Sequence, residues 1–410
     1  MTELLGKSKD ELRAFCAGLG EPAYRGAQIY HALYAERKFE FARMTNMPAA
    51  LRDRLAKEAS ITLPEIKQRY LSADGSVRFL LGLTGTEEKE FNTKNIGNGS
   101  TEGTEKTQKR PSHEEKPASV EAVFMPSEGR QTICISTQAG CAVDCHFCLT
   151  AQLGLIRNLT SGEILAQVLV ALGDHGRKAE GRIEEEHTWL KPACAGKPGA
   201  LQTRGNVQTN VVLMGQGEPL LNFEPVMAAL RILLDLEGMG ISPKHVTLST
   251  SGIVPGIERL AREKVRPKLA ISLNASNDEQ RNVLMPINKK YPLRVLMEAC
   301  KNYPLRPWEH LTFEYVMLGD LNDSAEDARR VVRLLAPLKR VKVNLIPWNS
   351  GDLPYRESSP ERIEEFQSTL NEKCVPTFVR YSRGRDVMAA CGQLALLDVS
   401  SQSGLVSIAP

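Results

Sequence analysis

The sequence of 410 residues predicts an α/β protein in which a partial (β/α)6 barrel follows a small helical N-terminal domain. Two patterns support this fold class. Residues 8–59 carry helical periodicity, and from about residue 119 onward short apolar runs alternate with capped amphipathic segments. Strands that alternate with helices in this way form parallel sheets. In a wound parallel sheet, the reactive side chains gather where the strands end at their carboxyl termini.

The first 62 residues read as a helical accessory domain. Ser8 and Glu11 form a capping-box pattern, and Leu12 and Phe15 begin an apolar stripe with helical spacing. The helical signal continues through residues 27–34. We therefore expect a compact helical unit ahead of the sheet.

Residues 63–125 read as a strand-rich connector. Strands are predicted at Ile66–Leu71, Val77–Leu83 and Ser119–Phe124, and residues 73–75 supply turn chemistry between the first two. Residues 91–118 contain almost nothing to bury, so we expect a disordered insertion there.

Residues 126–397 are predicted to form the barrel, and residues 398–410 a flexible tail. The expected strands are Thr132–Ser136, Asn210–Met214, Val246–Ser249, Lys268–Asn274, Leu311–Met317, Lys342–Ile346 and Thr377–Tyr381. The expected helices are Ser161–Leu172, Glu224–Leu236, Pro255–Glu263, Leu293–Asn302, Ala325–Leu335 and Pro360–Asn371. A second polar stretch, residues 174–206, is predicted to be a solvated surface insertion.

Composition excludes several classes of protein. Hydrophobic residues make up 42% of the chain, which excludes wholesale disorder, and the net charge of +3 is too small to indicate a polyanion partner by itself. The first residues lack the apolar core of a secretory signal, and no apolar run approaches the ~18 residues of a membrane span. We expect a soluble, cytoplasmic protein that is a monomer and has no membrane partner.

The clearest chemical signal is the C-x3-C-x2-C run of Cys141, Cys145 and Cys148, which lies between a predicted strand and a capped helix. Three thiolates from one loop can hold three irons of a [4Fe-4S] cluster, which leaves one iron open for another ligand. Two other readings stand beside this one. The loop could be a zinc knuckle with His146 as fourth ligand, or its cysteines could be buried and inert.

Five motifs narrow the interpretation: residues 132–141 (TICISTQAGC), 215–222 (GQGEPLLN), 247–252 (TLSTSG), 344–349 (NLIPWN) and 389–394 (AACGQL). Together with the cysteine loop, they resemble the RlmN family of the radical S-adenosylmethionine (SAM) superfamily, the dual-specificity RNA adenine-C2 methyltransferases. The resemblance runs from the N-terminal helices to about residue 395 and is interrupted by the two insertions. It implies a radical SAM barrel, a [4Fe-4S] cluster and SAM.

The resemblance also implies roles for particular residues. It makes Cys141, Cys145 and Cys148 the cluster ligands, and Phe147 either a shield for the cluster or an ordinary core aromatic. The SAM contacts that it implies are Gly217, Glu218, Ser249, Ser272, Leu273, Asn274 and Asn349. Caps or strand ends remain the alternative reading for the two serines and Asn349. Asn274 stands where the family commonly has His. Asn can still form a hydrogen bond to SAM there, but unlike His it does not titrate near neutral pH, which speaks against a role in proton transfer. Gln216, often Met in relatives, is a smaller departure.

Two further cysteines receive roles from the resemblance. Cys391 would accept a methyl group from one SAM, and a radical made from a second SAM would activate that group for addition to the base. Cys134 would then release the product and leave a transient disulfide with Cys391, while Glu121 would accept the proton from carbon 2. Without the resemblance, the two cysteines would read as buried small residues and Glu121 as a surface carboxylate on a strand face.

The implied partners are 23S rRNA near the peptidyl transferase centre, the tRNA anticodon loop and an electron donor such as flavodoxin or ferredoxin. Basic residues beside aromatic ones, as in residues 24–25, 37–39 and 380–385, support RNA binding weakly, because an ordinary solvated face has the same composition. A related enzyme that methylates carbon 8 of the same rRNA adenosine would share the cluster and both thiols. A rival from another class is a non-catalytic iron-sulfur or RNA-binding protein.

Overall fold

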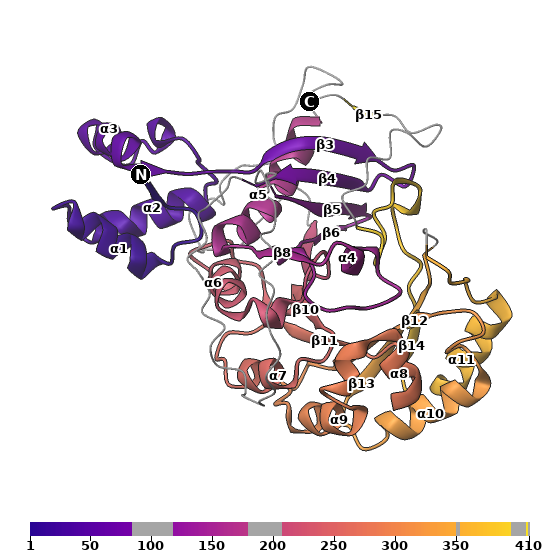
Figure 1. Ribbon diagram of the computed structural model, residues 1–410. Helices are drawn as coiled ribbons and strands as arrows, with labels where there is room; N and C mark the ends of the chain where they lie inside the picture. The colour runs from indigo at the N-terminus through magenta and orange to yellow at the C-terminus, as the bar shows by residue number, and fades with distance from the viewer. Residues whose placement is uncertain (84–117, 179–206, 350–352, 395–406, 409–410) are drawn as a thin grey trace, which may run out of the picture.

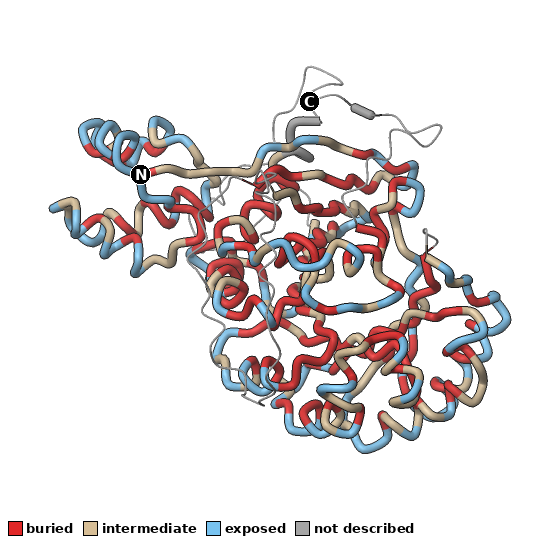
Figure 2. The backbone as a smooth tube through the Cα atoms, in the orientation of Figure 1, coloured by how far each residue is buried: buried red, intermediate tan, exposed pale blue. Residues whose placement is uncertain are grey.

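The computed structural model describes residues 1–83, 118–178, 207–349, 353–394 and 407–408, of which 174–178 and 407–408 are described by their backbone alone. A long twisted sheet runs through the molecule, and the N-terminal helices stand to one side of it (Figure 1). Buried residues follow the strands and the inner helix faces, while exposed residues follow the outer helix faces and the loops (Figure 2). The core therefore lies between the sheet and the helices that cover it.

The sheet has 11 strands within the described residues, in the order β14-β13-β12-β11-β10-β9-β6-β5-β4-β3-β15. The strands from β14 to β6 pair in parallel, and the ends of the sheet do not pair with each other, so the barrel is partial. These parallel strands are β6 (Arg130–Cys134), β9 (Gln208–Leu213), β10 (Val246–Thr250), β11 (Lys268–Ser272), β12 (Leu311–Met317), β13 (Val341–Pro347) and β14 (Thr377–Val379). The predicted fold class, an α/β partial barrel, is confirmed.

The remaining strands extend the sheet in antiparallel fashion. They are β5 (Ser119–Ser127), β4 (Val77–Gly82), β3 (Glu65–Leu71) and β15 (Ser407–Ile408). The proposed border at residue 125 falls inside β5, so the connector strands and the barrel share one sheet. Part of the predicted flexible tail pairs with β3, where Ser407 lies opposite Tyr70.

Helices cover the outer face of the parallel strands (Figure 1). They are α5 (Ser161–Lys178), α6 (Phe223–Leu234), α7 (Val254–Ala261), α9 (Leu293–Asn302), α10 (Ala325–Leu335) and α11 (Pro360–Glu372). Two short helices, α4 (Leu149–Gln152) and α8 (Asp278–Leu284), and the hairpin of β7 (Gln138–Gly140) with β8 (Leu155–Asn158) were not predicted. All four lie near the strand ends that carry the predicted site.

The N-terminal unit contains α1 (Lys9–Gly18), α2 (Tyr24–Tyr34) and α3 (Ala49–Glu58), together with the short parallel pair β1 (Thr2–Glu3) and β2 (Ala59–Ser60). The capping box predicted from Ser8 and Glu11 is present at the start of α1. Tyr30 on α2 donates a hydrogen bond of 2.8 Å to the carboxylate of Asp235 after α6, which attaches the unit to the barrel.

The predicted insertions lie mostly outside the described residues: residues 91–117 of the first and 179–206 of the second. Helix α5 continues to Lys178, so the first residues of the second insertion are helical. Within the described part of the chain, no helix is long and apolar enough to cross a membrane.

Candidate active site

Two cavities adjoin at the carboxyl ends of the parallel strands. The first, of about 170 Å³, is lined by Cys141, Cys145, Cys148, Gly217, Glu218, Ser249, Ser272, Asn274, Glu314, Asn349 and Cys391, among others. The second, of about 160 Å³, is lined by Met125, Cys134, Met214, Arg380, Tyr381, Arg383 and Cys391, among others. Cys391 lines both cavities, so it stands at their junction.

The cysteine loop leads from β7 into α4. The loop folds back on the hairpin because the Cys141 amide donates to the Gly154 carbonyl at 2.9 Å. Burial raises the pKa of Cys141 to about 12 and that of Cys145 well above its ordinary value. Neighbouring thiols that burial keeps protonated favour the binding of a positively charged iron core, because the positive charge stabilises their thiolate forms.

The donor set fits an iron-sulfur cluster better than a single metal ion. Across the described residues, no three His, Cys, Asp or Glu side chains converge on one ion position. The His146 Nε2 lies 3.4 Å from the Asp144 Oδ2. Cluster cysteines each bind a different iron and need not converge, so the three thiols suit a [4Fe-4S] group with one open iron. Phe147 lies in the apolar cluster with Leu284, Met285 and Trp348.

Glu218 is held rigidly at the end of the loop that follows β9. Its Oε2 accepts hydrogen bonds from the Ser251 amide at 2.7 Å and the Ser251 hydroxyl at 2.8 Å, and its Oε1 accepts from the Leu220 amide at 3.1 Å. Burial nevertheless raises the pKa of Glu218, because the three donors offset the lost hydration only in part. A buried carboxylate of this kind favours a cationic ligand.

Gly217 is required by close packing. Its φ is +95°, and an added Cβ would lie 2.5 Å from the Gln138 Cβ. The Gln138 Oε1 in turn accepts a hydrogen bond of 2.9 Å from the Glu218 amide. The glycine thus lets the loop press against β7 and aim Glu218 into the first cavity.

The predicted SAM contacts on β10 and β11 divide into two groups. Ser249 and Ser272 both line the first cavity, with 3.4 Å between their hydroxyls. Leu273, by contrast, belongs to the apolar core and is not among the residues that line this cavity. The Leu273 amide donates to the Glu314 carbonyl at 2.9 Å, so its backbone is hydrogen-bonded to the neighbouring strand β12.

Asn274 has a structural explanation in this chain. Its φ is +55°, a left-handed conformation that Asn adopts more readily than most residues. Its Oδ1 accepts from the Val316 amide at 2.8 Å, and its Nδ2 donates to the Met285 sulfur at 3.4 Å. The side chain therefore joins β12 to the segment after α8 while it lines the cavity.

Asn349 attaches the segment that carries Cys391 to the end of β13. Its Nδ2 donates to the Cys391 carbonyl at 3.1 Å and to the Ser382 hydroxyl at 2.9 Å. Cys391 keeps exposed surface, yet protein atoms surround its sulfur, and this burial raises its pKa to about 11 with a further contribution from Glu314. Glu314 is almost fully buried, which raises the pKa of its carboxyl, and it accepts from Asn344 at 2.9 Å.

Cys134 and Glu121 occupy different environments. Cys134 lines the second cavity, and burial raises the pKa of its thiol, with a contribution from the nearby Cys391. Glu121 is 1% exposed and pairs with Arg78, with 2.9 Å between Oε1 and Nη1. Gln216 donates to its other oxygen at 3.3 Å. Glu121 lines neither cavity, and its burial excludes the reading as a surface carboxylate.

Three residues at this site were not predicted from the sequence: Gln138, Ser251 and Glu314. Ser251 lies within the TLSTSG motif and Gln138 within TICISTQAGC, so the motifs themselves were the available signal. Glu314 had a weaker signal, since it is an isolated acidic residue inside an otherwise apolar predicted strand.

Comparison with known proteins gives consistent results. The family described as the ribosomal RNA large subunit methyltransferase N-terminal domain matches residues 2–61, and the radical SAM superfamily matches residues 200–335. A probable dual-specificity RNA methyltransferase RlmN of Koribacter versatilis is 43% identical, over 92% of this chain and 96% of that protein. The dual-specificity RNA methyltransferase RlmN of an Anaeromyxobacter species is 42% identical, over 94% of this chain and 88% of that protein. A radical SAM methyltransferase from Sphaerobacter thermophilus, solved by crystallography, is 36% identical with a TM-score of 0.77, and the match covers 96% of this chain and 99% of that one.

Proposed function

The chain belongs to the RlmN family of radical SAM RNA methyltransferases, and from this premise we propose that it forms 2-methyladenosine in 23S rRNA and in tRNA. The proposal includes a methyl-cysteine on Cys391 and a transient disulfide between Cys391 and Cys134. It also includes a [4Fe-4S] cluster on Cys141, Cys145 and Cys148.

The observation that carries the proposal is the position of Cys391 between the two cavities. On one side it faces the cavity that contains the three loop cysteines and Glu218. On the other it faces the cavity that contains Cys134. A thiol that must collect a methyl group at one site and deliver it to a base at another needs access to both.

The chain's own residues provide the binding site for SAM in this scheme. When bound, the cluster supplies the electron that cleaves SAM reductively. Glu218 presents a fixed carboxylate to the SAM ammonium group, and the hydroxyls of Ser249 and Ser272 offer hydrogen bonds from adjacent strands. Asn349 holds the backbone of Cys391 at the cavity junction, which keeps Cys391 at the wall of the cavity in which SAM would bind.

Cys391 acts as a nucleophile toward the sulfonium methyl group. The new bond joins its sulfur to the methyl carbon, the carbon–sulfonium bond breaks, and the thiol proton leaves. Because the pKa of Cys391 is raised to about 11, the thiolate needs either a proton acceptor or the nearby positive sulfonium. Glu314 lines the same cavity, and its carboxylate serves as the proton acceptor in this proposal.

The release step uses Cys134 and, in this proposal, Glu121. Cys134, as its thiolate, attacks the sulfur of Cys391, and the electron pair of the broken sulfur–carbon bond goes to the methylene carbon of the product, which takes up a proton and becomes the methyl group. The disulfide left between the two cysteines is reopened by a reductant that supplies two electrons. Arg78 pairs with Glu121 and fixes its position on β5, the strand next to β6. Glu121 is enclosed, so it can accept the carbon-2 proton in one of two ways. Either the proton passes through an intervening group such as Gln216, whose side chain donates a hydrogen bond to Glu121, or the base moves toward Glu121.

The mouth of the second cavity suits an RNA substrate. Arg380 and Arg383 line it together with Tyr381, a residue that is 65% exposed. Guanidinium groups bind phosphates, and an exposed aromatic ring stacks on an unpaired base. In the same proposal, the N-terminal helices are an RNA-binding accessory domain and a flavodoxin or ferredoxin supplies electrons.

Identification of the product tests the proposal. The protein is reconstituted with iron and sulfide without oxygen and then incubated with SAM, a reductant and unmodified 23S rRNA or tRNA. The nucleosides are identified by mass spectrometry against isomer standards. We expect 2-methyladenosine. Formation of 8-methyladenosine would assign the chain to the carbon-8 reaction, and absence of SAM cleavage would contradict the radical mechanism.

A further inference from the structure

Arg281 is a fully buried cation beside the predicted cluster loop, and neither the motifs nor the proposed mechanism uses it. It lies on α8 and is 0% exposed. Its Nε donates to the Leu273 carbonyl at 3.1 Å and its Nη1 to the Asn288 Oδ1 at 2.9 Å. Its Nη2 donates to the carbonyls of Ser251 at 2.6 Å and Ser272 at 3.1 Å.

All four acceptors are uncharged, which is unusual for a guanidinium this deeply buried. Three are main-chain carbonyls and one is a side-chain amide. Hydrogen bonds to dipoles compensate only part of the lost hydration of a charge, and a buried cation is normally balanced by an anion. Burial accordingly lowers the pKa of Arg281 to about 10, while the acidic groups facing it, Cys145, Asp278 and Cys300, act in the opposite direction.

The cluster loop is joined to the helix that carries Arg281. The His146 amide, between Cys145 and Cys148, donates to the carbonyl of Leu284 at the end of α8 at 3.0 Å. Leu284 and Met285 pack in one apolar cluster against Phe147, with Cys145 and Cys148 beside them. A charge on α8 therefore has a fixed location relative to the loop cysteines.

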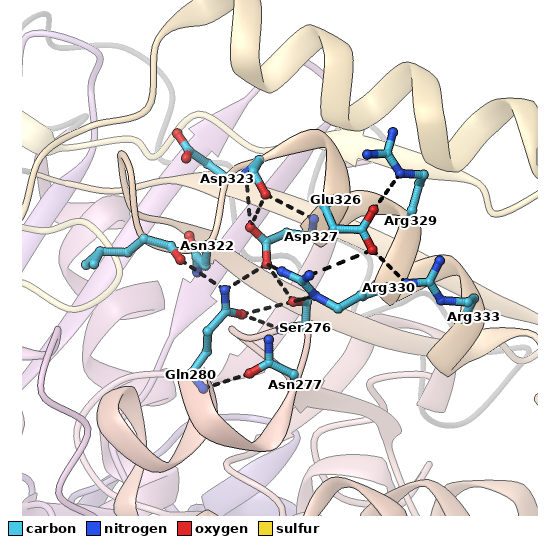
Figure 3. A network of polar contacts seen from close by, with 12 residues as sticks. Ser276, Asn277, Gln280, Asn322, Asp323, Glu326, Asp327, Arg329, Arg330 and Arg333 are labelled. Atoms are coloured by element: carbon cyan, nitrogen blue, oxygen red, sulfur yellow. Dashed lines mark hydrogen bonds and ion pairs between the residues drawn. The ribbon is translucent and has the colours of Figure 1, made fainter.

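The network in Figure 3 fixes α8 at its other end. Asn277 caps the helix by accepting from the Gln280 amide at 2.8 Å. The Gln280 side chain and the Ser276 hydroxyl donate to the same oxygen of Asp327 on α10, at 2.7 Å and 2.6 Å. Because both ends of the short helix are tied, Arg281 cannot easily move away from the loop.

We propose that Arg281 is a positioning residue that supplies the buried counter-charge for the cluster and raises its reduction potential. This inference rests on the cluster assignment in the proposed function. Three thiolates around a [4Fe-4S]²⁺ core give a net charge of −1, and reduction adds one more negative charge. A fixed cation in a site of low dielectric stabilises the reduced form more than the oxidised form. The same guanidinium holds Ser251, whose amide and hydroxyl hold Glu218.

The test is a redox titration of the reconstituted cluster in the absence of SAM, in which electron paramagnetic resonance measures the fraction of reduced cluster at each potential. Arg281→Gln removes the charge, and we expect a midpoint potential more negative than that of the wild type. Arg281→Lys keeps the charge, and we expect a potential closer to the wild-type value than that of the Gln variant. Arg262→Gln is the matched control, because it changes the net charge equally at an exposed position after α7, and we expect no shift.

Several outcomes would overturn the proposal. Equal potentials in the wild type and a folded Arg281→Gln protein with full iron content would show that the charge does not act on the cluster. Equal shifts in the Gln and Lys variants would assign the effect to lost packing instead of lost charge. Failure of the wild type to bind any cluster would contradict the proposed function itself, which keeps the two failures distinct.

A second variant covers the case in which Arg281→Gln does not fold. Asp278 is half-buried and its negative charge faces Arg281. Asp278→Asn removes that charge, so we expect the potential to shift in the positive direction. An unchanged potential in a folded Asp278→Asn protein, or a negative shift, would contradict the inference.

Discussion

Replacement of Glu218 by Gln is expected to weaken SAM binding strongly while leaving the fold intact. The carboxylate lies in the first cavity with both oxygens already oriented by Ser251 and Leu220. Loss of one charge-assisted hydrogen bond to the SAM ammonium group costs about 1.5–3 kcal/mol, which corresponds to about 10- to 150-fold weaker binding. Isothermal titration of SAM into the anaerobically reconstituted protein measures this ratio.

The pH dependence of stability gives an independent check on Glu218. Burial raises the pKa of its carboxyl in the folded protein above the ordinary value of 4.5. The unfolded chain therefore loses this proton first, so the contribution of Glu218 to stability is present below about pH 4.5 and is lost as the pH rises through the folded value. Without SAM, the stability of the wild type relative to Glu218→Gln should fall over this interval.

The control for both measurements is Glu364→Gln, which makes the same charge change at an exposed position on α11. This control should bind SAM as the wild type does. If Glu218→Gln bound SAM within twofold of the wild type, the assignment of Glu218 to the ammonium group would be wrong.

Three further predictions concern neighbouring residues. Arg78→Met leaves the Glu121 carboxylate buried without its cation, so urea unfolding should show a loss of about 3–5 kcal/mol; an unchanged midpoint would contradict the buried pair. Gly217→Ala should weaken SAM binding, because a Cβ there lies 2.5 Å from the Gln138 Cβ; wild-type affinity would show that the loop shifts freely. In cluster-free protein, the rate at which iodoacetamide labels Cys391 should rise as the pH approaches 11, since the pKa of this thiol is about 11. Cys134 should be labelled more slowly than Cys391, because burial raises the pKa of Cys134 further. Mass spectrometry of the labelled peptides measures both rates, and a labelling rate of Cys391 that does not depend on pH would exclude the raised pKa.

The sequence predicted the long elements well and the short ones poorly. The strand Leu311–Met317 and the helices Leu293–Asn302 and Ala325–Leu335 have the predicted bounds, because each has a clear apolar period and a capping or turn signal. Helix α8 was missed because its seven residues, DEQRNVL, contain too few apolar positions to show a helical period. The hairpin of β7 and β8 was missed because one of its strands has only three residues and the loop cysteines interrupt the pattern.

The motifs identified the cavity residues, but the contacts between distant segments could not be read from the chain. Arg281 stands in a polar stretch that suggests an exposed helix face, yet it is buried because its acceptors come from the segments around Ser251, Ser272 and Asn288. Glu121 lies on a strand whose neighbour β4 supplies the buried Arg78, and no local pattern marks that partner. The resemblance implied Leu273 as a SAM contact together with Ser272 and Asn274, and the side chain of Leu273 lies in the core.

The central claim is that Cys391 carries the methyl group to RNA and Cys134 releases the product, and Cys134→Ala tests it most directly. The variant is incubated with SAM, a reductant and RNA, and the mixture is separated under denaturing conditions. We expect a covalent adduct of protein and RNA that is absent from the double variant Cys134→Ala/Cys391→Ala. Normal formation of free methylated RNA by the single variant would contradict the two-thiol mechanism.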